Sequence, residues 1–499
     1  MYLLGGEGSD PGPESADDTG FSSGRNNLKS NQFIGFHSEW NLGSPGGWDY
    51  QRITQKIGKA VFAFLSRRVD FGIDLDFDIA LLSPVYGFVE MLAGLHRNRE
   101  GSNPGVVAVV AEEETLADVV ENRNLAEWIS NVPGLKGVLM APQEMESKNG
   151  RACWRGEPIS VVFMDFNTDV LLKLHRKHGL NPLLQAVREN RVINPRGSEP
   201  INVKSVFELI TDPLRNSCFH PETIRRTPWT RQFYPRKTSG PNGEDIKDLQ
   251  EWTRVHWDNL VLKPARGYSG HGVRVGGVHP DAEDAVQTAT AAGDYIVQQK
   301  VPLSLWAEDM PEIAADSLEV VTVRRQTDFR CLFGADTLFG FVARYGQVPT
   351  NVGSGGGFQP MAVLRSEVSV REATDRINAT IAGLSPETVS EALALQQQMA
   401  VAHHFTYLLG PVNIALRPRL ITTQQIEALE SYCSRIWEDC LTLEKMWFSG
   451  DLDRLISLEP EELEIARSQP WRGSPAIFSS DGIFSFGAHR NGDTSSYED

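Results

Sequence analysis

The 499-residue chain has few cysteines, no long apolar run and no cluster of basic residues. Its five cysteines include no C-x-x-C pair, which argues against a disulfide framework and against a zinc site. A reducing, cytoplasmic location is the simplest prediction. Because no run of about 18 apolar residues occurs, we expect no transmembrane helix and no membrane partner.

The charge balance is strongly acidic, with a formal net charge of -17. A nucleic-acid-binding protein usually carries a basic face, so we expect no nucleic-acid partner and interpret the acidity as a solvated surface. The first residues, MYLLGGEGSD, lack the basic and apolar regions of a secretory signal. Residues 1–30 are rich in Gly, Ser, Asp and Pro, which predicts a flexible tail.

The length and the 40% hydrophobic content predict two or three domains with a real core. Apolar periodicity predicts a helix over 50–66. Apolar runs at 104–114, 136–145 and 157–167 predict buried parallel strands, and a helical pattern at 124–132 lies between the first two. This alternation predicts a Rossmann-like α/β layer, although no G-x-G-x-x-G sequence is present.

The rest of the chain has a different pattern. Alternating residues over 318–357, with a G-A-D-T turn, predict antiparallel strands. Residues 366–457 are mainly helical, apart from a strand-like piece at 407–418. We therefore divide the chain into a tail (1–30), an N-terminal α/β domain (31–200), a core (201–365) and a helical C-terminal region that completes the fold (366–499).

One short stretch, VLKPARGYSGHGVRV at 261–275, points to phosphate chemistry. Lys263 ends an apolar strand and leads into a loop with Gly267, Gly270 and Gly272. Glycines allow main-chain N–H groups to approach phosphate oxygens, and the lysine adds a positive charge. The order differs from a P-loop, because the lysine precedes the glycines. Taken alone, the stretch also fits a hairpin whose glycines are purely structural.

Further pieces occur in a fixed order around this loop. They are Lys204, Pro228-Trp229-Thr230, Gln298-Gln299-Lys300-Val301, Asp328-Phe329-Arg330, Arg344, and Asn351 before Gly355-Gly356-Gly357. With Lys263, this series resembles the ATP-grasp superfamily over residues 160–365. The segment from Asp328 to Gly357 looks most like the ribosomal-protein glutamate ligases of that superfamily.

The resemblance implies an α/β ATP-grasp fold with a Rossmann-like domain before it, and ATP and Mg²⁺ as cofactors. Lys204 and Lys263 would contact the α and β phosphates, and main-chain groups of 298–301 would read the adenine. The loop 267–272 would close over the phosphates, with Ser269 and His271 among its residues. Glu308 would hold the ribose. Arg330 and Arg344 would stabilise the transferred phosphoryl group and the tetrahedral intermediate.

The metal-binding strand of the superfamily, an Asp followed by Glu-x-Asn, is not found after residue 357. A circular permutation like that of glutathionylspermidine synthase-like proteins would place the metal strand early in the chain. The segment 67–90 is the candidate, through Asp70, Asp74, Asp76 and Asp78, although four such aspartates also fit a solvated hairpin. Alternatively, Asp328 and Asn351 are the metal ligands, or the site has degenerated.

Three functional hypotheses follow. The first is an ATP-dependent carboxylate–amine ligase that joins small-molecule substrates, such as an amino acid or small peptide and an amine, through an acyl phosphate. The second is a nucleotide-binding protein that keeps the fold without ligase activity, which the missing Glu-x-Asn favours. The third is a phosphotransferase that uses the same phosphate cradle. The oligomeric state stays open, and relatives in the superfamily make a homo-oligomer one of the outcomes to test.

Overall fold

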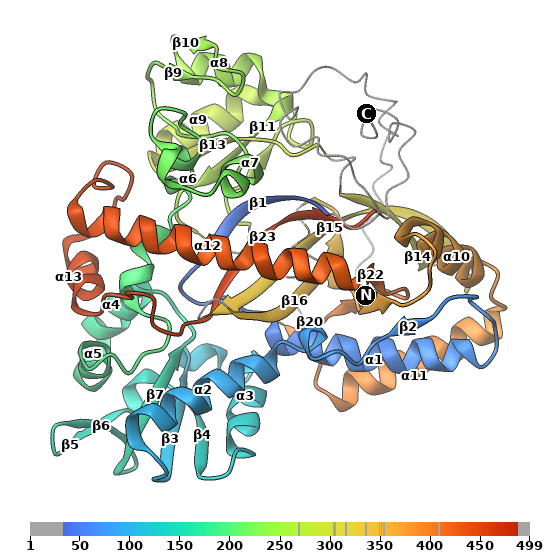
Figure 1. Cartoon of the computed structure of the whole chain (residues 1–499), viewed down its shortest axis with the longest axis horizontal. Coiled ribbons are helices and arrows are strands. Elements are labelled where there is room, and N and C mark those ends of the chain that lie inside the picture. The colour runs from blue at the N-terminus through green and yellow to red at the C-terminus, as the bar shows by residue number, and fades with distance from the viewer. Residues whose placement is uncertain are drawn as a thin grey trace.

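The computed structural model describes residues 33–267, 270–302, 306–314, 317–334, 337–348, 350, 352, 355–407 and 410–487. Over these residues the protein is a mixed α/β protein with several sheets. Figure 1 shows a large central sheet, an α/β unit below it and a smaller unit above it. The predicted α/β class is confirmed at this level.

The central sheet contains seven strands in the order β1-β23-β15-β16-β17-β21, with β14 beside β15. Its strands are β1 (Ile34–Asn41), β14 (Ala307–Ile313), β15 (Val320–Gly334), β16 (Thr337–Gly346), β17 (Gly357–Phe358), β21 (Asn413–Ile414) and β23 (Phe478–Ser485). β15 and β16 pair antiparallel, as predicted. The residues of the expected turn, 335 and 336, lie outside the described residues.

Strands from opposite ends of the chain lie side by side in this sheet. β1 pairs antiparallel with β23, and β23 pairs antiparallel with β15. The sequence analysis places residues 34–41 and 478–485 in separate regions of the chain and does not predict that they pair. The reason is physical: FSSDGIFS is rich in Ser and Gly and has little intrinsic strand preference, so its pairing depends on tertiary contacts.

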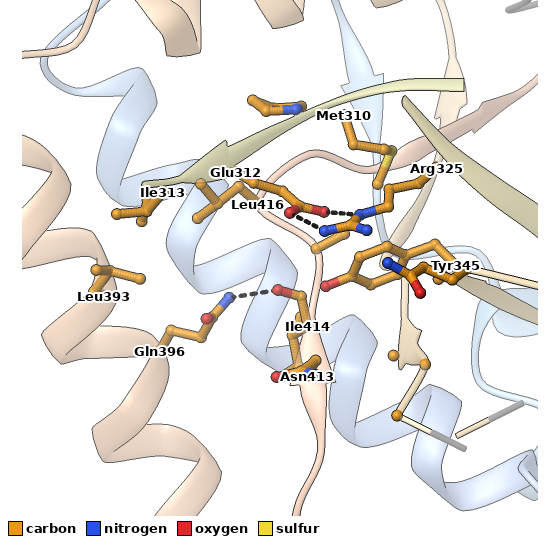
Figure 2. A pocket seen from close by; sticks show the side chains of 17 residues that line it. Met310, Glu312, Ile313, Arg325, Tyr345, Leu393, Gln396, Asn413, Ile414 and Leu416 are labelled. Atoms are coloured by element: carbon orange, nitrogen blue, oxygen red, sulfur yellow. Dashed lines mark hydrogen bonds and ion pairs between the residues drawn. The ribbon is translucent and has the colours of Figure 1, made fainter. Parts of the chain in front are cut away.

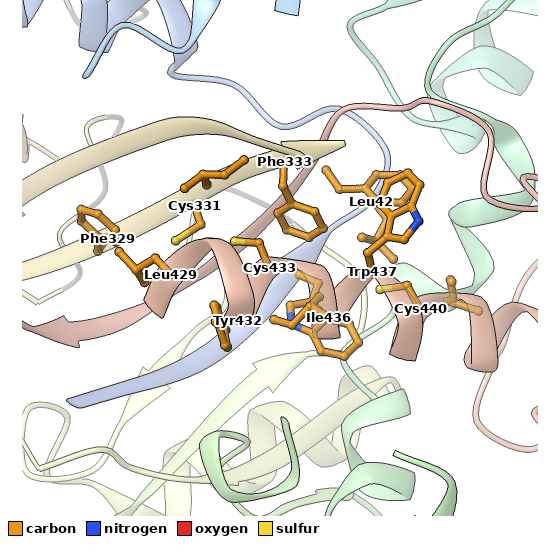
Figure 3. Close-up of a cluster of buried hydrophobic side chains, with 14 of the residues drawn as sticks. Leu42, Phe329, Cys331, Phe333, Leu429, Tyr432, Cys433, Ile436, Trp437 and Cys440 are labelled. Carbon is orange, nitrogen blue, oxygen red and sulfur yellow. The ribbon is translucent and has the colours of Figure 1, made fainter. Parts of the chain in front are cut away.

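A long helix, α12 (Thr423–Ser449), covers one face of the central sheet. A capping box between Thr422 and Gln425 starts it, and Gly450 in the left-handed conformation ends it. Figure 3 shows its apolar stripe packed against the aromatic residues of β15. The contacting residues include Leu429, Tyr432, Cys433, Ile436 and Trp437 on the helix and Phe329, Cys331 and Phe333 on the strand.

The opposite face packs against helices from distant parts of the chain. These are α1 (Trp48–Ser66), α10 (Val370–Ala382) and α11 (Pro386–Ala402). The predicted helix over 50–66 is thus confirmed. Gln51 of α1 accepts the Ala343 N–H and donates to the Gln359 carbonyl, which anchors this helix to the sheet edge.

The α/β unit contains a five-stranded sheet in the order β4-β3-β7-β6-β5. Its elements are α2 (Val85–Glu100), β3 (Gly105–Val110), α3 (Val120–Ser130), β4 (Leu135–Met140), β5 (Glu146–Lys148), β6 (Arg151–Trp154), β7 (Glu157–Met164), α4 (Thr168–His178) and α5 (Asn181–Arg188). β3, β4 and β7 are parallel, which confirms the three predicted strands.

The smaller unit contains an antiparallel sheet in the order β12-β11-β13-β8. Its elements are α6 (Val206–Ile210), α7 (Pro221–Arg226), β8 (Thr230–Gln232), α8 (Leu249–Val255), β11 (Leu260–Pro264), β12 (Arg274–Val275), α9 (Ala282–Ala292) and β13 (Tyr295–Gln299). α6 is only five residues long and begins after Lys204. β11 contains Lys263 near its end, and β13 runs antiparallel beside it.

The remaining elements are short connections, apart from α13. They are β2 (Leu75–Asp76), β9 (Thr238–Ser239), β10 (Asp245–Ile246), β18 (Met361–Leu364), β19 (Thr406–Tyr407), β20 (Gly410–Pro411), β22 (Arg419–Ile421), α13 (Pro460–Ser468) and several 3₁₀ turns. The five cysteines are free thiols. No helix in the described part of the chain is both long and apolar enough to cross a membrane.

The acidic segment 67–90 forms turns, a two-residue strand and the start of α2, and its carboxylates make local contacts. Asp70 accepts the Gly72 N–H, Asp76 pairs with Arg365, and Asp78 pairs with Lys59. These are turn and surface contacts, so the structure favours a solvated segment over a metal strand. Among the described residues, no group of three or more His, Cys, Asp or Glu side chains could hold a metal ion.

Candidate functional site

The two lysines singled out from the sequence belong to the smaller unit and reach β1 of the central sheet. The Lys204 Nζ lies 3.2 Å from Glu39 Oε2 and donates to the Gly267 carbonyl at 3.0 Å. The Lys263 Nζ donates to Gln298 Oε1 at 2.8 Å and to the Ser38 carbonyl at 3.5 Å. Both lysines therefore contact β1, a strand that lies far from them in sequence.

Glu39 is the acidic partner of these lysines. Burial alone would raise its pKa, but Lys204, Lys263 and Arg330 lower that pKa to about 2. Glu39 is therefore ionised at neutral pH. The effect on Lys263 is complementary: burial lowers its pKa to about 8, with Glu39 opposing the change and Lys204 adding to it.

A second carboxylate, Asp481, stands directly opposite Glu39 in the β1–β23 register, and Arg330 stands opposite Asp481 on the next strand. Side chains at paired positions of a sheet share a face, so the three form one row across β1, β23 and β15. The Arg330 Nε donates to the two Asp481 oxygens at 2.8 and 2.9 Å. The register shifts between His37 and Glu39, and this bulge fixes which face Glu39 occupies.

The other arginine, Arg344, lies beside this row. It forms a two-pronged contact with Asp328, at 2.7 and 2.8 Å, and approaches Asp481 to 3.9 Å. Burial would lower the pKa of Arg344, but Asp328 and Asp481 raise it, so the guanidinium remains charged. Thr350 also donates to Asp328 at 2.6 Å. The structure thus brings Lys204, Lys263 and both predicted arginines to one site.

The glycine loop adopts backbone conformations that favour glycine. Gly267, Gly270 and Gly272 have φ angles of 136°, 72° and 74°. The Tyr295 hydroxyl donates to the Gly272 carbonyl at 3.0 Å, which holds the end of the loop against β13. His271 is exposed, and Ser269 lies outside the described residues.

The stretch predicted to read adenine, 298–301, begins in β13 and ends two residues beyond it. Its amides at Gln299 and Lys300 donate to the carbonyls of Trp229 and Asn259, both at 2.8 Å. The Lys300 Nζ donates to the Gly276 carbonyl at 3.0 Å, so this side chain links the 298–301 stretch to the residue that follows β12. Main-chain recognition of a base would consequently depend on Val301 and on the carbonyls of this stretch.

Three other predicted residues are less well placed for their roles. Glu308 is 3% exposed and pairs with Arg417 within the protein interior, which disfavours a ribose contact. Asp328 uses both carboxylate oxygens on Arg344, which disfavours it as a metal ligand. Asn351 lies outside the described residues.

Sequence reasoning missed Glu39, Asn41 and Asp481, which the structure adds to the site. Glu39-Trp40-Asn41 is a Glu-x-Asn sequence on one strand, and this spacing places both side chains on the same face. The Asn41 amide holds the following turn, with its Oδ1 accepting from Ser44 N at 3.1 Å. The signal was present in the sequence, but 165 residues before Lys204 rather than after residue 357.

Two cavities lie apart from this row of charges. The first, of about 420 Å³, is polar and lies between β14, β16 and α11; Figure 2 shows the Glu312–Arg325 ion pair and Tyr345 in its wall. The second, of about 450 Å³, is apolar and includes Met91, Leu95 and Phe339 in its lining. Neither is lined by the two lysines.

No protein-family model matches the chain, and no curated protein matches it either. The charges and the geometry of the site are therefore the features that indicate a function.

Proposed function

We propose that the protein is an ATP-dependent carboxylate–amine ligase with an ATP-grasp arrangement. In this arrangement the Glu-x-Asn strand is β1 and the Asp strand is β23, so the two strands that carry these carboxylates lie on either side of the lysine segments in the chain. The observation that carries the proposal is the convergence of Lys204, Lys263, Arg330 and Arg344 on the two carboxylates Glu39 and Asp481.

The cations are suited to a polyphosphate. Lys204 and Lys263 come from the smaller unit, and the glycine loop next to Lys263 offers main-chain N–H groups. Glu39 neutralises part of this charge in the protein alone. A triphosphate between the two lysines would take over the ion pairs now made with Glu39 and release that carboxylate toward a cation.

The donor set fits Mg²⁺. Glu39 is a hard oxygen ligand whose ion pair with Lys204 the phosphates would take over, whereas both oxygens of Asp481 accept from Arg330, as those of Asp328 accept from Arg344. A magnesium ion at a nucleotide usually needs one or two carboxylates together with phosphate oxygens, so a cluster of three acidic residues is not required. When bound, the ion would supply charge neutralisation to the phosphates and orient them.

The two arginines would act on the transferred group. Arg330 and Arg344 lie on the same face of β15 and β16 as the carboxylate pair, and Asp481 and Asp328 hold their guanidinium groups in place. Fixed charges stabilise a developing negative charge without reorganising during the reaction. In a ligase, they would bind the acyl phosphate formed from the carboxylate substrate while the amine attacks its carbonyl carbon.

The missing Glu-x-Asn sequence is the feature that favoured a nucleotide-binding protein without activity. Glu39-x-Asn41 supplies such a sequence at the site, which supports an active protein over an inactive one. Nothing at the site selects a phosphotransferase over a ligase.

The proposal is tested by measuring ADP release with Mg²⁺ and ATP against a panel of amino acids, each with and without an amine. We expect ADP that depends on both substrates, together with a new amide mass in the product. ADP formation with phosphate appearing on a hydroxyl acceptor would indicate the phosphotransferase. ATP binding without turnover in every mixture would contradict catalysis.

A further inference from the structure

The polar cavity of about 420 Å³ lies on the face of the central sheet opposite the candidate functional site. Successive side chains of a strand alternate between its two faces, so Tyr345 of β16 points away from its neighbour Arg344. On β15, Arg325 and Arg330 are an odd number of positions apart and likewise lie on opposite faces. Arg325 and Tyr345 line the cavity, so the sheet itself separates this cavity from the two arginines of the proposed reaction centre.

Both signs of charge meet in one wall of the cavity. Glu312 of β14 accepts from the Nε and Nη2 groups of Arg325, each at 2.6 Å. The Arg325 Nη1 group has no acceptor among the described residues, and an ionised carboxylate has about four lone-pair sites, of which Arg325 fills one on each oxygen. The pair can therefore bind an anion through Arg325 and a cation through Glu312 while it stays intact.

Tyr345 adds a neutral hydroxyl to the same cavity. Figure 2 shows this hydroxyl pointing from the wall toward the middle of the cavity, and it makes no hydrogen bond to the described residues. Burial and the nearby Glu312 raise the pKa of Tyr345, so the hydroxyl stays protonated at neutral pH and can both donate and accept. A half-buried hydroxyl that the described part of the protein leaves free is available to a ligand.

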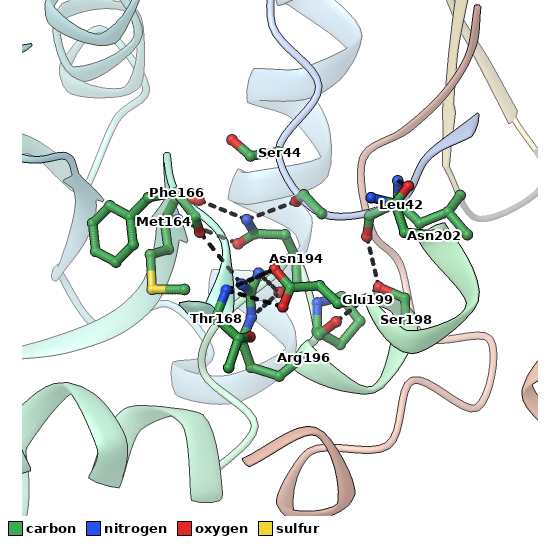
Figure 4. A network of polar contacts seen from close by, with 12 residues as sticks. Leu42, Ser44, Met164, Phe166, Thr168, Asn194, Arg196, Ser198, Glu199 and Asn202 are labelled. Carbon is green, nitrogen blue, oxygen red and sulfur yellow. Dashed lines mark hydrogen bonds and ion pairs between the residues drawn. The ribbon is translucent and has the colours of Figure 1, made fainter. Parts of the chain in front are cut away.

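The cavity differs in this respect from a polar network elsewhere in the protein. In the α/β unit, Asn194 donates to the Gly43 and Met164 carbonyls at 2.8 and 2.6 Å and accepts the Met164 N–H at 3.2 Å (Figure 4). That amide is used at both ends. The Asn413 side chain in the cavity wall, by contrast, has no hydrogen-bond partner among the described residues. The polar groups of the cavity are therefore not committed to the fold.

The other side of the cavity is apolar. Ile313, Leu393 and Leu416 line it. Figure 2 shows Ile313 and Leu393 across the space from Tyr345. The volume of about 420 Å³ lies in the usual range of small-molecule pockets. A ligand lying across the cavity would place charged groups at the ion pair and an aliphatic group against α11.

We propose that this cavity binds a free α-amino acid with an aliphatic side chain. The α-carboxylate would accept from Arg325 and Tyr345, and the α-ammonium group would donate to Glu312. The aliphatic side chain would lie against Leu393. A zwitterion carries one charge of each sign and so is complementary to a wall with one charge of each sign. The site is separate from the proposed reaction centre, and its existence does not depend on the ligase function.

Binding is measured by titration in saturation-transfer NMR, with L-leucine as the probe. 4-Methylpentanoate is leucine without its ammonium group, and 3-methylbutylammonium is leucine without its carboxylate. We expect saturable binding of leucine and binding of each analogue that is weaker by about tenfold or more, because each analogue lacks one charge-assisted contact. No leucine signal in the wild type, or equal affinity for either analogue, would overturn the proposal.

Two variants test the cavity wall. Arg325→Gln should weaken leucine binding by about tenfold or more. Arg254→Gln is the matched control and should bind leucine normally, because Arg254 forms a 2.6 Å ion pair with Glu283 in the smaller unit and does not line the cavity. Tyr345→Phe should weaken leucine binding by about three- to tenfold and leave urea unfolding unchanged, because its hydroxyl has no partner among the described residues.

The outcomes separate the cavity from the proposed ligase. Equal leucine binding in a folded Arg325→Gln protein would overturn the site, and if that variant misfolds, unchanged binding in Tyr345→Phe would overturn it instead. The double variant Lys204→Met/Lys263→Met should bind leucine as the wild type does. Loss of leucine binding from this folded double variant would assign the amino acid to the nucleotide site and overturn the cavity. A wild type that binds leucine but releases no ADP in any mixture would keep the cavity and reject the ligase.

Discussion

Lys263 should be needed for nucleotide binding and should destabilise the protein without nucleotide. Its fall in pKa from 10.5 to about 8 corresponds to a cost of about 3 kcal/mol, at roughly 1.4 kcal/mol per pKa unit. Lys263→Met removes this cost but leaves the buried Gln298 Oε1 without its donor, which costs about 1–3 kcal/mol. We therefore expect Lys263→Met to raise the free energy of unfolding by about 1–2 kcal/mol at pH 7.

The shifted pKa of Lys263 also predicts how the stability of the protein depends on pH. Its folded pKa lies below the unfolded value, so the folded protein binds fewer protons between pH 8 and 10.5. Lys263 should therefore increase the free energy of unfolding of the wild type as the pH rises through this window. That contribution should be absent in Lys263→Met.

The assay is urea unfolding at pH 7, 8, 9 and 10, with ATP binding measured in parallel. Loss of one charged contact to phosphate should weaken ATP binding by about 10- to 150-fold, which corresponds to about 1.5–3 kcal/mol. Lys247→Met is the control, because Lys247 is an exposed lysine of the same unit. A less stable Lys263→Met protein that binds ATP normally would refute both the electrostatic and the functional reasoning.

Three other changes test separate parts of the site. Asp481→Asn should reduce Mg²⁺-dependent ADP release at least 100-fold, as measured by enzyme kinetics. It should also destabilise the protein by about 2–5 kcal/mol, as measured by urea unfolding, because Arg330 would stay buried without its carboxylate. Glu39 has a folded pKa of about 2, so its contribution to stability is present above its unfolded pKa of 4.5 and is lost as the pH falls toward 2. Because its side chain is 36% exposed, we expect this contribution to be only about 1 kcal/mol. In Glu39→Gln, the free energy of unfolding should therefore change less steeply with pH in acid. Gly272→Ala should weaken ATP binding in calorimetry and leave the bulk of the fold intact, because its φ of 74° and the Tyr295 hydroxyl, 2.7 Å from the new Cβ, would displace the glycine loop.

The sequence predicted the elements whose pattern is local. The helix over 50–66 and the parallel strands of the α/β unit have strong apolar periodicity, and the structure contains them. Lys263, Arg330 and Arg344 were found because each lies on a strand with a recognisable neighbour, and Lys204 was found because it precedes a helical pattern. Local patterns of this kind do not depend on distant parts of the chain.

The carboxylate half of the site could not be located in the same way. Glu39 and Asp481 are 442 positions apart in the sequence and meet only because β1 pairs with β23. Pairing between strands so far apart produces no local pattern of apolar residues in the sequence. In addition, the Ser-rich β23 does not stand out as a strand. The cluster of aspartates at 70–78 was more conspicuous, but those side chains make turn and surface contacts.

The most direct test of the proposed nucleotide site is calorimetric titration with the non-hydrolysable analogue AMP-PNP, with and without Mg²⁺. We expect saturable binding to the wild type, weakened when Mg²⁺ is withheld and abolished in the double variant Lys204→Met/Lys263→Met. The absence of binding to the wild type with Mg²⁺, or equal binding to the folded double variant, would contradict the proposed site.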